Sequence, residues 1–350
     1  MSDSNSDRAA TAAAAQTLPP SAQVVQMAGG LVISRAIFAV AELGIADYLK
    51  DGSRSSDEIA KATDTHAPSL YRLLRFAAGL GFFVEDADKR FSLTPLGAAL
   101  QSDAPGYARS TVRMLAGSTA WSAWGEFLHS VKTGETAMEK AFGQPIFDYL
   151  STEPEQASYF NEAMIGFHGA EPPAVAAAYD FSGIRRLVDV GGGTGNLLTT
   201  ILLANPELKG MLYDLPHVTA EARSQIELKN LSERCEIVAG SFFESVPGGG
   251  DAYILSHIIH DWNEHKCLQI LENCRRAMPD DGRLLLVEMV VPAGNDFHPA
   301  KFLDLTMLTF TGGMERTEQE YAALFSKAGF NLTRVVPTES PVSVIEAKPI

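Results

Sequence analysis

Hydrophobic and polar residues follow two different rhythms along the chain, and the change of rhythm divides it into a front and a back. In the front, the apolar residues are spaced as they are in amphipathic helices. In the back, short apolar runs alternate with helical patterns. The sequence therefore predicts a helical front followed by an α/β domain.

The front contains the pattern of two helices and a hairpin. Ser55 and Glu58 have capping-box spacing at the start of SSDEIAKAT. Pro68 suits the first turn of a second helix, PSLYRLLRFAAGLG, which ends at glycines. FFVEDADKRFSL then predicts two short strands joined by a polar turn. This order is a winged-helix layout, and one function of such a layout is to read DNA.

The charge of the front disfavours that function. Up to residue 110 there are 10 Lys and Arg against 12 Asp and Glu, a net charge of −2, and the whole chain carries −15. The helix that would read DNA offers only Arg72 and Arg75, whereas a DNA reader must neutralise several phosphates. A charge of −15 should also repel nucleic acid and anionic membranes. We expect a scaffold or dimerisation role, with no nucleic-acid or membrane partner.

The N-terminal segment predicts a tail followed by an apolar helix pair. Roughly the first 20 residues are rich in Ser, Ala and Thr and lack the pattern of a signal peptide, which indicates a disordered tail. The apolar stretch from Val24 to Leu49 is interrupted by Ser34, Arg35 and Glu42, which suits a buried or interface helix pair better than a membrane span. We expect this stretch to be buried against a second copy of the chain.

Three cysteines, Cys235, Cys267 and Cys274, form no CxxC pair. Such an odd and sparse set argues against a disulfide framework and against a cysteine zinc site. A reducing, cytoplasmic location is therefore expected.

The back of the chain predicts a doubly wound, mostly parallel sheet of Rossmann-like type. Its predicted strands are LVDV, GMLYDL, CEIVAG, AYILS and RLLLVEM, with helical patterns between them. We divide the chain into a tail (1–22), a winged-helix-like dimerisation domain (23–110), a helical linker that contributes to a substrate pocket (111–180) and the α/β domain (181–350). Pro172-Pro173 and FSGIRR mark the entry to this last domain.

A glycine turn follows the first of these strands. Gly191, Gly193 and Gly195 form G-x-G-x-G, but Asn196 stands where the dinucleotide fingerprint needs a glycine. The following helix N-terminus favours a carboxylate. Asp214 ends the next strand, 19 residues past Gly195, where an acid can bind both hydroxyls of a ribose. These features describe S-adenosylmethionine better than NAD, although a tight turn with a surface aspartate is the structural alternative.

The segment SHIIHDWNEH, residues 256–265, holds three histidines at the predicted carboxyl edge of the sheet. His257, His260 and His265 lack an HExxH pattern or a cysteine ligand, so we expect no metal. A proton-transfer role and a structural role both remain open for His260 on the spacing alone.

In this order, LVDVGGGTG, YDLP, HDW, VEM and GGMERTEQEY resemble the motifs of the S-adenosylmethionine-dependent small-molecule O-methyltransferases. That family includes plant caffeic-acid-type enzymes and bacterial enzymes that tailor antibiotics, polyketides and phenazines. The resemblance runs from about residue 24 to the C-terminus. It implies a homodimer, S-adenosylmethionine as cofactor, and O-methylation of a small aromatic or polyketide-like metabolite.

The resemblance also implies catalytic residues: His260 as general base, with Glu288 and Glu315 as supporting acids. The roles make physical sense because a phenol with a pKa near ~10 must lose its proton, and an imidazole near ~6.5 in hydrogen-bond reach can take it. A carboxylate fixes the tautomer of the ring and stabilises the imidazolium.

For the cofactor, the resemblance carries over to Gly191, Gly193 and Asp214, and two departures follow. Where the family has Gly-Asp after the third strand, this chain has Gly240-Ser241, followed by Phe242, which can flank the adenine. Ser256 stands where plant members have a lysine. Cofactor affinity is therefore expected to be weaker, or the adenosine to be held differently.

Substrate contacts transfer less directly. Met164 and Met307 match methionines that clamp flat acceptors in plant enzymes, although plain core packing explains them equally well. Asp261 of the HDW motif is grouped with them as a substrate-side residue. The acceptor itself does not transfer, because the substrate-binding Asn of the plant enzymes is absent. N- or C-methylation, a non-methylating relative, and a winged-helix binding or regulatory protein are the alternatives.

Overall fold

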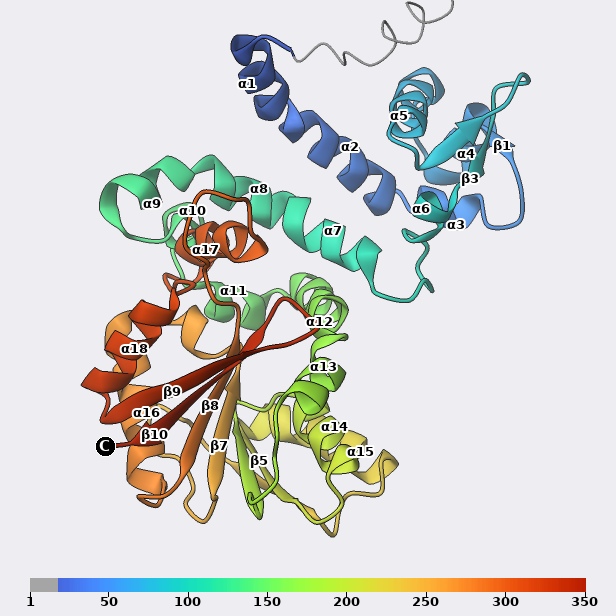
Figure 1. Ribbon diagram of the computed structural model, residues 1–350. Coiled ribbons are helices and arrows are strands. Elements are labelled where there is room, and N and C mark those ends of the chain that lie inside the picture. Colours follow the sequence, from blue (N-terminus) through green and yellow to red (C-terminus); the bar gives the residue numbers. More distant parts are fainter. Residues whose placement is uncertain (1–17) are drawn as a thin grey trace, which may run out of the picture. The chain divides into compact units, whose positions relative to one another are not determined.

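The computed structural model describes residues 18–350, apart from the side chain of Glu221 (Figure 1). Residues 1–17 of the predicted tail lie outside the described part, and helix α1 (Pro20–Ala28) begins inside the range predicted as tail. The chain forms two compact units that meet in sequence between Gly117 and Ser118.

The first unit packs helices around a small antiparallel sheet of order β1-β3-β2. The predicted helix–helix–hairpin order is present, and both hydrogen bonds of the Ser55–Glu58 capping box form. Its core includes Ile45, Leu74 and Phe91, all essentially inaccessible to solvent. Besides α1, its elements are α2 (Gly30–Glu42), α3 (Ile45–Tyr48), β1 (Arg54–Ser55), α4 (Ser56–Thr63), α5 (Ala67–Gly79), β2 (Phe83–Glu85), β3 (Arg90–Leu93), α6 (Pro95–Ala98) and α7 (Ala108–Ala116).

Helices α1 and α2 expose an apolar face. Six large side chains on it are more than 40% exposed within the single chain: Val24, Val25, Met27, Leu31, Val32 and Ile33. The stretch Pro20–Glu42 is also long and apolar enough to cross a membrane by length and composition, and 11% of its apolar 18-residue window is buried. Within the first unit, the predicted stretch from Val24 to Leu49 is therefore buried only in its second half, where the buried apolar residues are Val40, Ala41, Ile45, Ala46 and Leu49.

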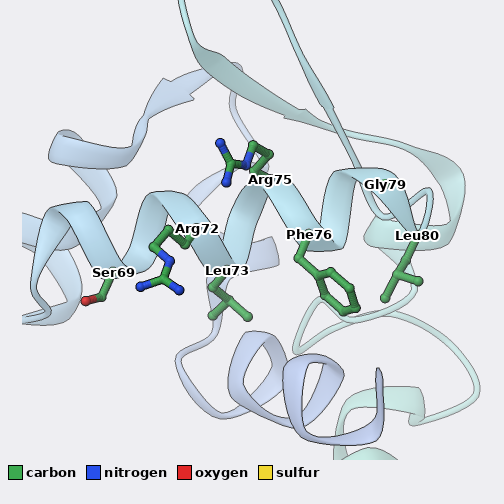
Figure 2. A pocket seen from close by; sticks show the side chains of 7 residues that line it. All are labelled: Ser69, Arg72, Leu73, Arg75, Phe76, Gly79 and Leu80. Atoms are coloured by element: carbon green, nitrogen blue, oxygen red, sulfur yellow. The ribbon is translucent and has the colours of Figure 1, made fainter. Parts of the chain in front are cut away.

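A hollow of about 760 Å³ runs along α5 and is lined by this helix and the residue after it. Figure 2 shows Arg75 on the opposite side of the helix from Leu73 and Phe76. Arg72 and Arg75 are three residues apart on this helix, and both line the hollow.

The second unit carries the main sheet, of order β6-β5-β4-β7-β8-β10-β9. Five strands are parallel, and β10 runs antiparallel to both β8 and β9. The strands are β4 (Arg186–Val190), β5 (Lys209–Asp214), β6 (Cys235–Ala239), β7 (Ala252–Ser256), β8 (Arg283–Glu288), β9 (Phe330–Pro337) and β10 (Ser343–Pro349). The mostly parallel, doubly wound sheet is as predicted, while the β9–β10 hairpin was not foreseen.

Helices cover both faces of this sheet (Figure 1). One apolar core joins strand residues such as Tyr253 to Phe325, and the other joins residues such as Leu187 to Ile201. The helices that follow β4 in the chain are α14 (Asn196–Ala204), α15 (Pro216–Leu228), α16 (Glu264–Ala277), α17 (Pro299–Phe310) and α18 (Glu318–Lys327), together with the short 3-10 helix η1 (Ile259–Asp261).

The helices before the sheet belong to the same unit. They are α8 (Ser118–Gly125), α9 (Phe127–Thr133), α10 (Ala137–Phe142), α11 (Ile146–Thr152), α12 (Pro154–His168) and α13 (Glu171–Ala178). Helix α13 packs on α14, and α10 packs on α17, so these segments share the core of the second unit. The observed division at Gly117 therefore differs from the boundaries expected at 110 and 180, and Pro172-Pro173 lie in the first turn of α13.

Candidate active site

The predicted site residues gather where the parallel strands end. The glycine turn follows β4, Asp214 ends β5, Ser256 ends β7 and Glu288 ends β8. In parallel α/β sheets this carboxyl edge is where ligands bind, because loops from neighbouring strands open there. Residues that are far apart in sequence thus meet at one edge.

His260 lies in η1, directly after β7, and is 6% exposed. Its Nδ1 is 2.6 Å from Glu315 Oε1. The loop that carries Glu315 is tied to the same turn, since the Met314 N–H donates to the His260 carbonyl at 2.9 Å. The remaining Glu315 oxygen, Oε2, is buried without a hydrogen-bond partner among the described residues.

Glu288 supports the same turn differently. Its Oε1 accepts from the backbone N–H groups of Ile259 (2.7 Å) and His260 (3.1 Å), and its Oε2 accepts from the Tyr321 hydroxyl (2.5 Å). Glu288 and Glu315, which the sequence grouped together as supporting acids, therefore make different contacts. Glu315 bonds the imidazole, and Glu288 fixes the backbone that carries it.

The side chain of His260 lies among several buried carboxyl groups. Burial by itself lowers the pKa of His260, but the charges of Asp261, Glu315 and Glu288 and the hydrogen bond to Glu315 raise it to about 10. Asp261 Oδ1 is 3.8 Å from Nε2, and burial raises the pKa of Asp261 to about 6 although His260 opposes this. Burial also raises the pKa of Glu315. The imidazole is therefore a strong base held among carboxylates.

A second histidine cluster lies beside the first and was missed by the sequence analysis. Glu171 Oε2 is 2.7 Å from His257 Nε2 and 3.0 Å from His168 Nδ1. Burial opposes ionisation of Glu171, but the hydrogen bonds from both histidines lower its pKa to about 2. Burial lowers the pKa of His257 to about 4, so this ring is neutral, and it lies with its centroid 5.1 Å from that of His260.

Two imidazoles and a carboxylate are also a donor set that a transition metal accepts. The rings here hydrogen-bond the carboxylate directly, at 2.7 and 3.0 Å, whereas ligands on a tetrahedral ion with bonds of ~2.1 Å lie roughly 3.4 Å apart. The observed spacing is therefore that of a hydrogen-bonded triad. Nothing in the sequence pattern signalled this triad, because His168 and Glu171 come from the α12–α13 boundary, far from His257 in the chain. His265, the third histidine of the segment 256–265, is exposed on α16.

The glycine turn has the backbone that its residues predict. Gly191, Gly193 and Gly195 all have positive φ, at +73°, +57° and +78°. A Cβ at Gly191 would lie 2.5 Å from Ile258, whereas a Cβ at Gly193 would meet nothing within 4 Å. Gly193 thus leaves space for a ligand to approach the backbone, and its N–H donates to Asp214 Oδ2 at 2.8 Å. A turn with open space and an anchored carboxylate fits the ribose and amino-acid parts of S-adenosylmethionine.

Asp189 adds a buried acid below this turn. Its Oδ2 has no hydrogen-bond partner among the described residues, and burial followed by the charge of Asp214 raises its pKa to about 7. The residue had no predicted role beyond its place in the strand LVDV, although an aspartate between valines in a buried strand is itself a sequence signal.

The other predicted cofactor residues lie around the turn. The Phe242 ring is 3.4 Å from the Cβ position of Gly191 and packs edge-on to Trp262. Ser241 Oγ accepts from the Phe243 N–H at 3.3 Å, a local contact within its own loop. Ser256, the last residue of β7, is partly buried. Phe242 is therefore brought to the glycine turn, while the Ser241 hydroxyl is engaged in its own loop.

The substrate-side methionines lie on two helices. Met164 is partly buried on α12, and Met307 is 8% exposed on α17. Met307 lies one helical turn beyond Asp304, whose carboxylate accepts from the Glu315 N–H at 2.9 Å. The structure thus links the helix of Met307 to the His260–Glu315 pair, while no hydrogen bond or ring contact joins Met164 to that pair.

The fold and the edge residues define the class of protein. A glycine turn with an acid at the end of the next strand, beside a buried His–Glu pair, is the arrangement of a Rossmann-like methyltransferase that uses S-adenosylmethionine. Comparison with known proteins gives the family. Residues 124–331 match an O-methyltransferase domain, and residues 25–103 match an O-methyltransferase dimerisation domain.

Individual relatives agree over nearly the full length. A phenazine O-methyltransferase from Lysobacter antibioticus is 43% identical, over 96% of this chain and 98% of the relative. An 8-amino-8-demethylriboflavin N,N-dimethyltransferase from Streptomyces davaonensis is 34% identical, over 91% of this chain and 92% of the relative. A solved O-methyltransferase of neocarzinostatin biosynthesis, in complex with S-adenosylmethionine and a hydroxynaphthoic acid, is 33% identical with a TM-score of 0.81, covering 91% and 96% of the two chains. The chain belongs to the O-methyltransferase family, and its cofactor is S-adenosylmethionine.

Proposed function

We propose that this enzyme methylates a phenolic hydroxyl on a flat, fused-ring metabolite of the phenazine type, with His260 as the proton acceptor. The observation that carries the proposal is the 2.6 Å contact between His260 Nδ1 and Glu315 at the carboxyl edge of the sheet. The acceptor class is supported by the phenazine O-methyltransferase that is 43% identical over 96% of this chain.

Glu315 fixes which nitrogen of His260 is used. A carboxylate at Nδ1 keeps a proton on that atom, so Nε2 is the atom that meets the acceptor hydroxyl. Glu288 holds the η1 backbone through two N–H groups, so the ring cannot drift along the turn. Bound S-adenosylmethionine supplies an electrophilic methyl group on a sulfonium, and transfer requires in-line alignment with the acceptor oxygen.

The acids around His260 match its basicity to that of a phenol. A phenol has a pKa of ~10, close to the raised pKa of His260 of about 10. A neutral imidazole with a phenol and an imidazolium with a phenolate then have nearly equal free energies. His260 and the acids around it therefore let the acceptor oxygen gain negative charge as the methyl group arrives. The burial of His260 keeps water away from the proton that it shares with the acceptor.

For the cofactor we assign Gly191 and Gly193 to backbone approach, Asp214 to the ribose hydroxyls and Phe242 to one side of the adenine. Ser241 and Ser256 complete this site as neutral residues. Met164, Met307 and Asp261 are assigned to the acceptor side. The exposed apolar face of α1 and α2 forms the homodimer contact, in keeping with the dimerisation domain that residues 25–103 match. Three free, buried cysteines suit a reducing cytoplasm.

N-methylation is the second candidate, because one relative, 34% identical to this chain, is an N,N-dimethyltransferase. An amine acceptor would also release a proton to a base. The same site residues therefore serve both reactions, and the atom methylated must be measured.

The test is a matched pair of acceptors, 1-hydroxyphenazine and 1-aminophenazine, each incubated with S-adenosylmethionine and analysed by mass spectrometry. We expect one added methyl on the hydroxyl compound and little on the amine. Methylation of the amine alone would replace O-methylation by N-methylation, and no product from either would refute the phenazine class. The His260→Ala protein is the control for His260-dependent turnover.

A further inference from the structure

Arg316 is a buried guanidinium that has so far been given no function. It is 3% exposed, and its side-chain contacts among the described residues are hydrogen bonds to two carbonyls and one thiol, with no ion pair. Burying a charge is costly unless it is paired or fully hydrogen-bonded. Its contacts here are a few rather long hydrogen bonds, so stability alone does not account for it.

Those hydrogen bonds lead to both halves of the His260–Glu315 pair. Nη1 donates to the Ile259 carbonyl at 3.4 Å and to the Met314 carbonyl at 3.2 Å. Ile259 directly precedes His260, and Met314 directly precedes Glu315. One guanidinium nitrogen therefore bridges the backbone of the two segments whose side chains must meet at 2.6 Å.

Two further contacts fix the guanidinium itself. Nη2 donates to Cys267 Sγ at 3.5 Å, and this thiol in turn donates to the Ile259 carbonyl at 3.2 Å. The Arg316 carbonyl accepts from the Val291 N–H at 2.9 Å, which ties the loop to the segment after β8. The arginine is thus anchored to α16 and to the sheet edge while it holds the two loops.

The charge of Arg316 also lies in an acidic setting. The titratable groups that interact with it or with His260 come from the elements packed around the pair: His257 after β7, Asp261 on η1, Glu264 and Cys267 on α16, Glu288 on β8, Asp304 on α17, Glu315 on its loop, and Tyr321 on α18. With carboxylates in excess of cations, a fixed positive charge disfavours further protonation of the imidazole.

We propose that Arg316 is a positioning residue, whose guanidinium holds the His260 and Glu315 segments in register and whose charge offsets the acids around His260. The catalytic consequence rests on the proposed function, but the geometric one does not. Two variants separate the two contributions. Arg316→Lys keeps the charge and loses the bridging fork, whereas Arg316→Met loses both.

The first readout needs no acceptor. A histidine N–H bonded to a carboxylate at 2.6 Å should give a far-downfield proton NMR signal, assigned by its loss in His260→Ala. We expect this signal to weaken or disappear in both Arg316 variants. The pH titration of His260, followed by ¹⁵N NMR, should move to higher pH in Arg316→Met and stay in place in Arg316→Lys. Arg276→Met, an exposed arginine of the same unit, is the matched control and should leave both signals unchanged.

The second readout is catalysis with 1-hydroxyphenazine. Both Arg316 variants should lose about 10- to 100-fold in kcat, the scale of a small misplacement of a catalytic group, while calorimetric affinity for S-adenosylhomocysteine stays within about twofold. A folded Arg316→Met protein with the wild-type NMR signal and titration overturns the proposal, even if its melting temperature falls. If Arg316→Met does not fold, Arg316→Lys decides by the same signal. Since the NMR measurement uses no acceptor, failure of the methylation assay would count against the proposed function alone.

Discussion

At the scale of single residues, the chemistry depends on how the environment of one histidine differs from that of its neighbour. His257 and His260 are three residues apart and both are buried. Burial lowers the pKa of His257 to about 4, although the one carboxylate that it meets, Glu171, which is shared with His168, opposes this. The other is surrounded by three acids, and its pKa rises to about 10. Only the second is a base of useful strength toward a phenol.

The first prediction concerns the base. His260→Ala should lower kcat by ~10²–10⁴-fold, the usual contribution of one general base, and leave cofactor binding intact. The loss should shrink for an acceptor whose hydroxyl is already ionised at the assay pH. Steady-state kinetics with calorimetry of S-adenosylhomocysteine measures both. Wild-type turnover of a neutral phenol by the folded variant would refute the assignment, and His265→Ala, at an exposed position of α16, serves as the matched control.

The second prediction concerns pH. Reaction requires that His260 and the acceptor hydroxyl share one proton between them. An enzyme with a protonated His260 and a neutral phenol together carry two. The profile of kcat/KM should therefore rise with pH and level off near the lower of the two pKa values, that of the acceptor or that of His260 at about 10. A more acidic acceptor should move the rising limb to lower pH. A limb fixed near pH 6.5 for every acceptor would contradict the raised basicity of His260.

The same shift predicts how stability depends on pH. The folded pKa of His260 lies above its unfolded value of ~6.5, so its contribution is fully present below that value and is lost as pH rises toward about 10. The free energy of unfolding of the wild type, relative to His260→Gln, should therefore decline between pH 7 and pH 10. Urea unfolding at several pH values checks this, and a difference that grows with pH would contradict it.

At the scale of elements, the site is a meeting of short, irregular segments on a rigid sheet. The η1 turn and the loop carrying Glu315 pack so closely that a Cβ at Gly313 would lie 1.9 Å from the His260 carbonyl oxygen. No side chain larger than hydrogen fits there without moving one of the two segments. The glycine is therefore a geometric requirement of the His260–Glu315 contact.

Gly313→Ala should consequently separate the two segments. We expect a loss of ~1–3 kcal/mol in stability from overpacking and a fall in kcat of about 10- to 100-fold, with cofactor affinity little changed. Gly125→Ala, at a position with nothing within 4 Å of the added Cβ, is the matched control. Thermal unfolding together with kinetics tests this. An unchanged kcat in Gly313→Ala would show that the loop tolerates the shift.

At the scale of the whole molecule, the apolar face of α1 and α2 is the feature that a single chain leaves unexplained. Six large apolar side chains more than 40% exposed on consecutive helices favour association, since such a patch is unfavourable in water. The match of residues 25–103 to a dimerisation domain agrees with this.

Light scattering should therefore give twice the chain mass of 37.7 kDa at micromolar concentration. Leu31→Glu, which places a charge on this face, should shift the protein toward monomer because burying an unpaired charge is costly. Leu228→Glu, an exposed leucine on α15, is the control and should remain dimeric. A wild-type protein that is monomeric under these conditions would contradict the interface.

The sequence by itself determined the features that depend on local pattern. Five parallel strands, the capping box of Ser55 and Glu58 and the positive-φ glycine turn all follow from hydrophobic runs, short spacings and the backbone freedom of glycine. The grouping of His260, Glu288 and Glu315 came from family motifs, and the structure brings these three residues to one place.

Only the tertiary structure decided which contacts each of these residues makes. Glu288 and Glu315 differ only in which atoms they meet, and those atoms come from segments 28 to 55 positions away in the chain. Glu171 and His168 carried no sequence signal, and Arg316 stood in a family motif without an assigned role, because their partners are carbonyls and rings brought close by packing. The unit boundary at Gly117 likewise follows from helices packing on helices far along the chain. Local patterns encode backbone preference, whereas pKa values and contacts depend on neighbours that only the folded chain supplies.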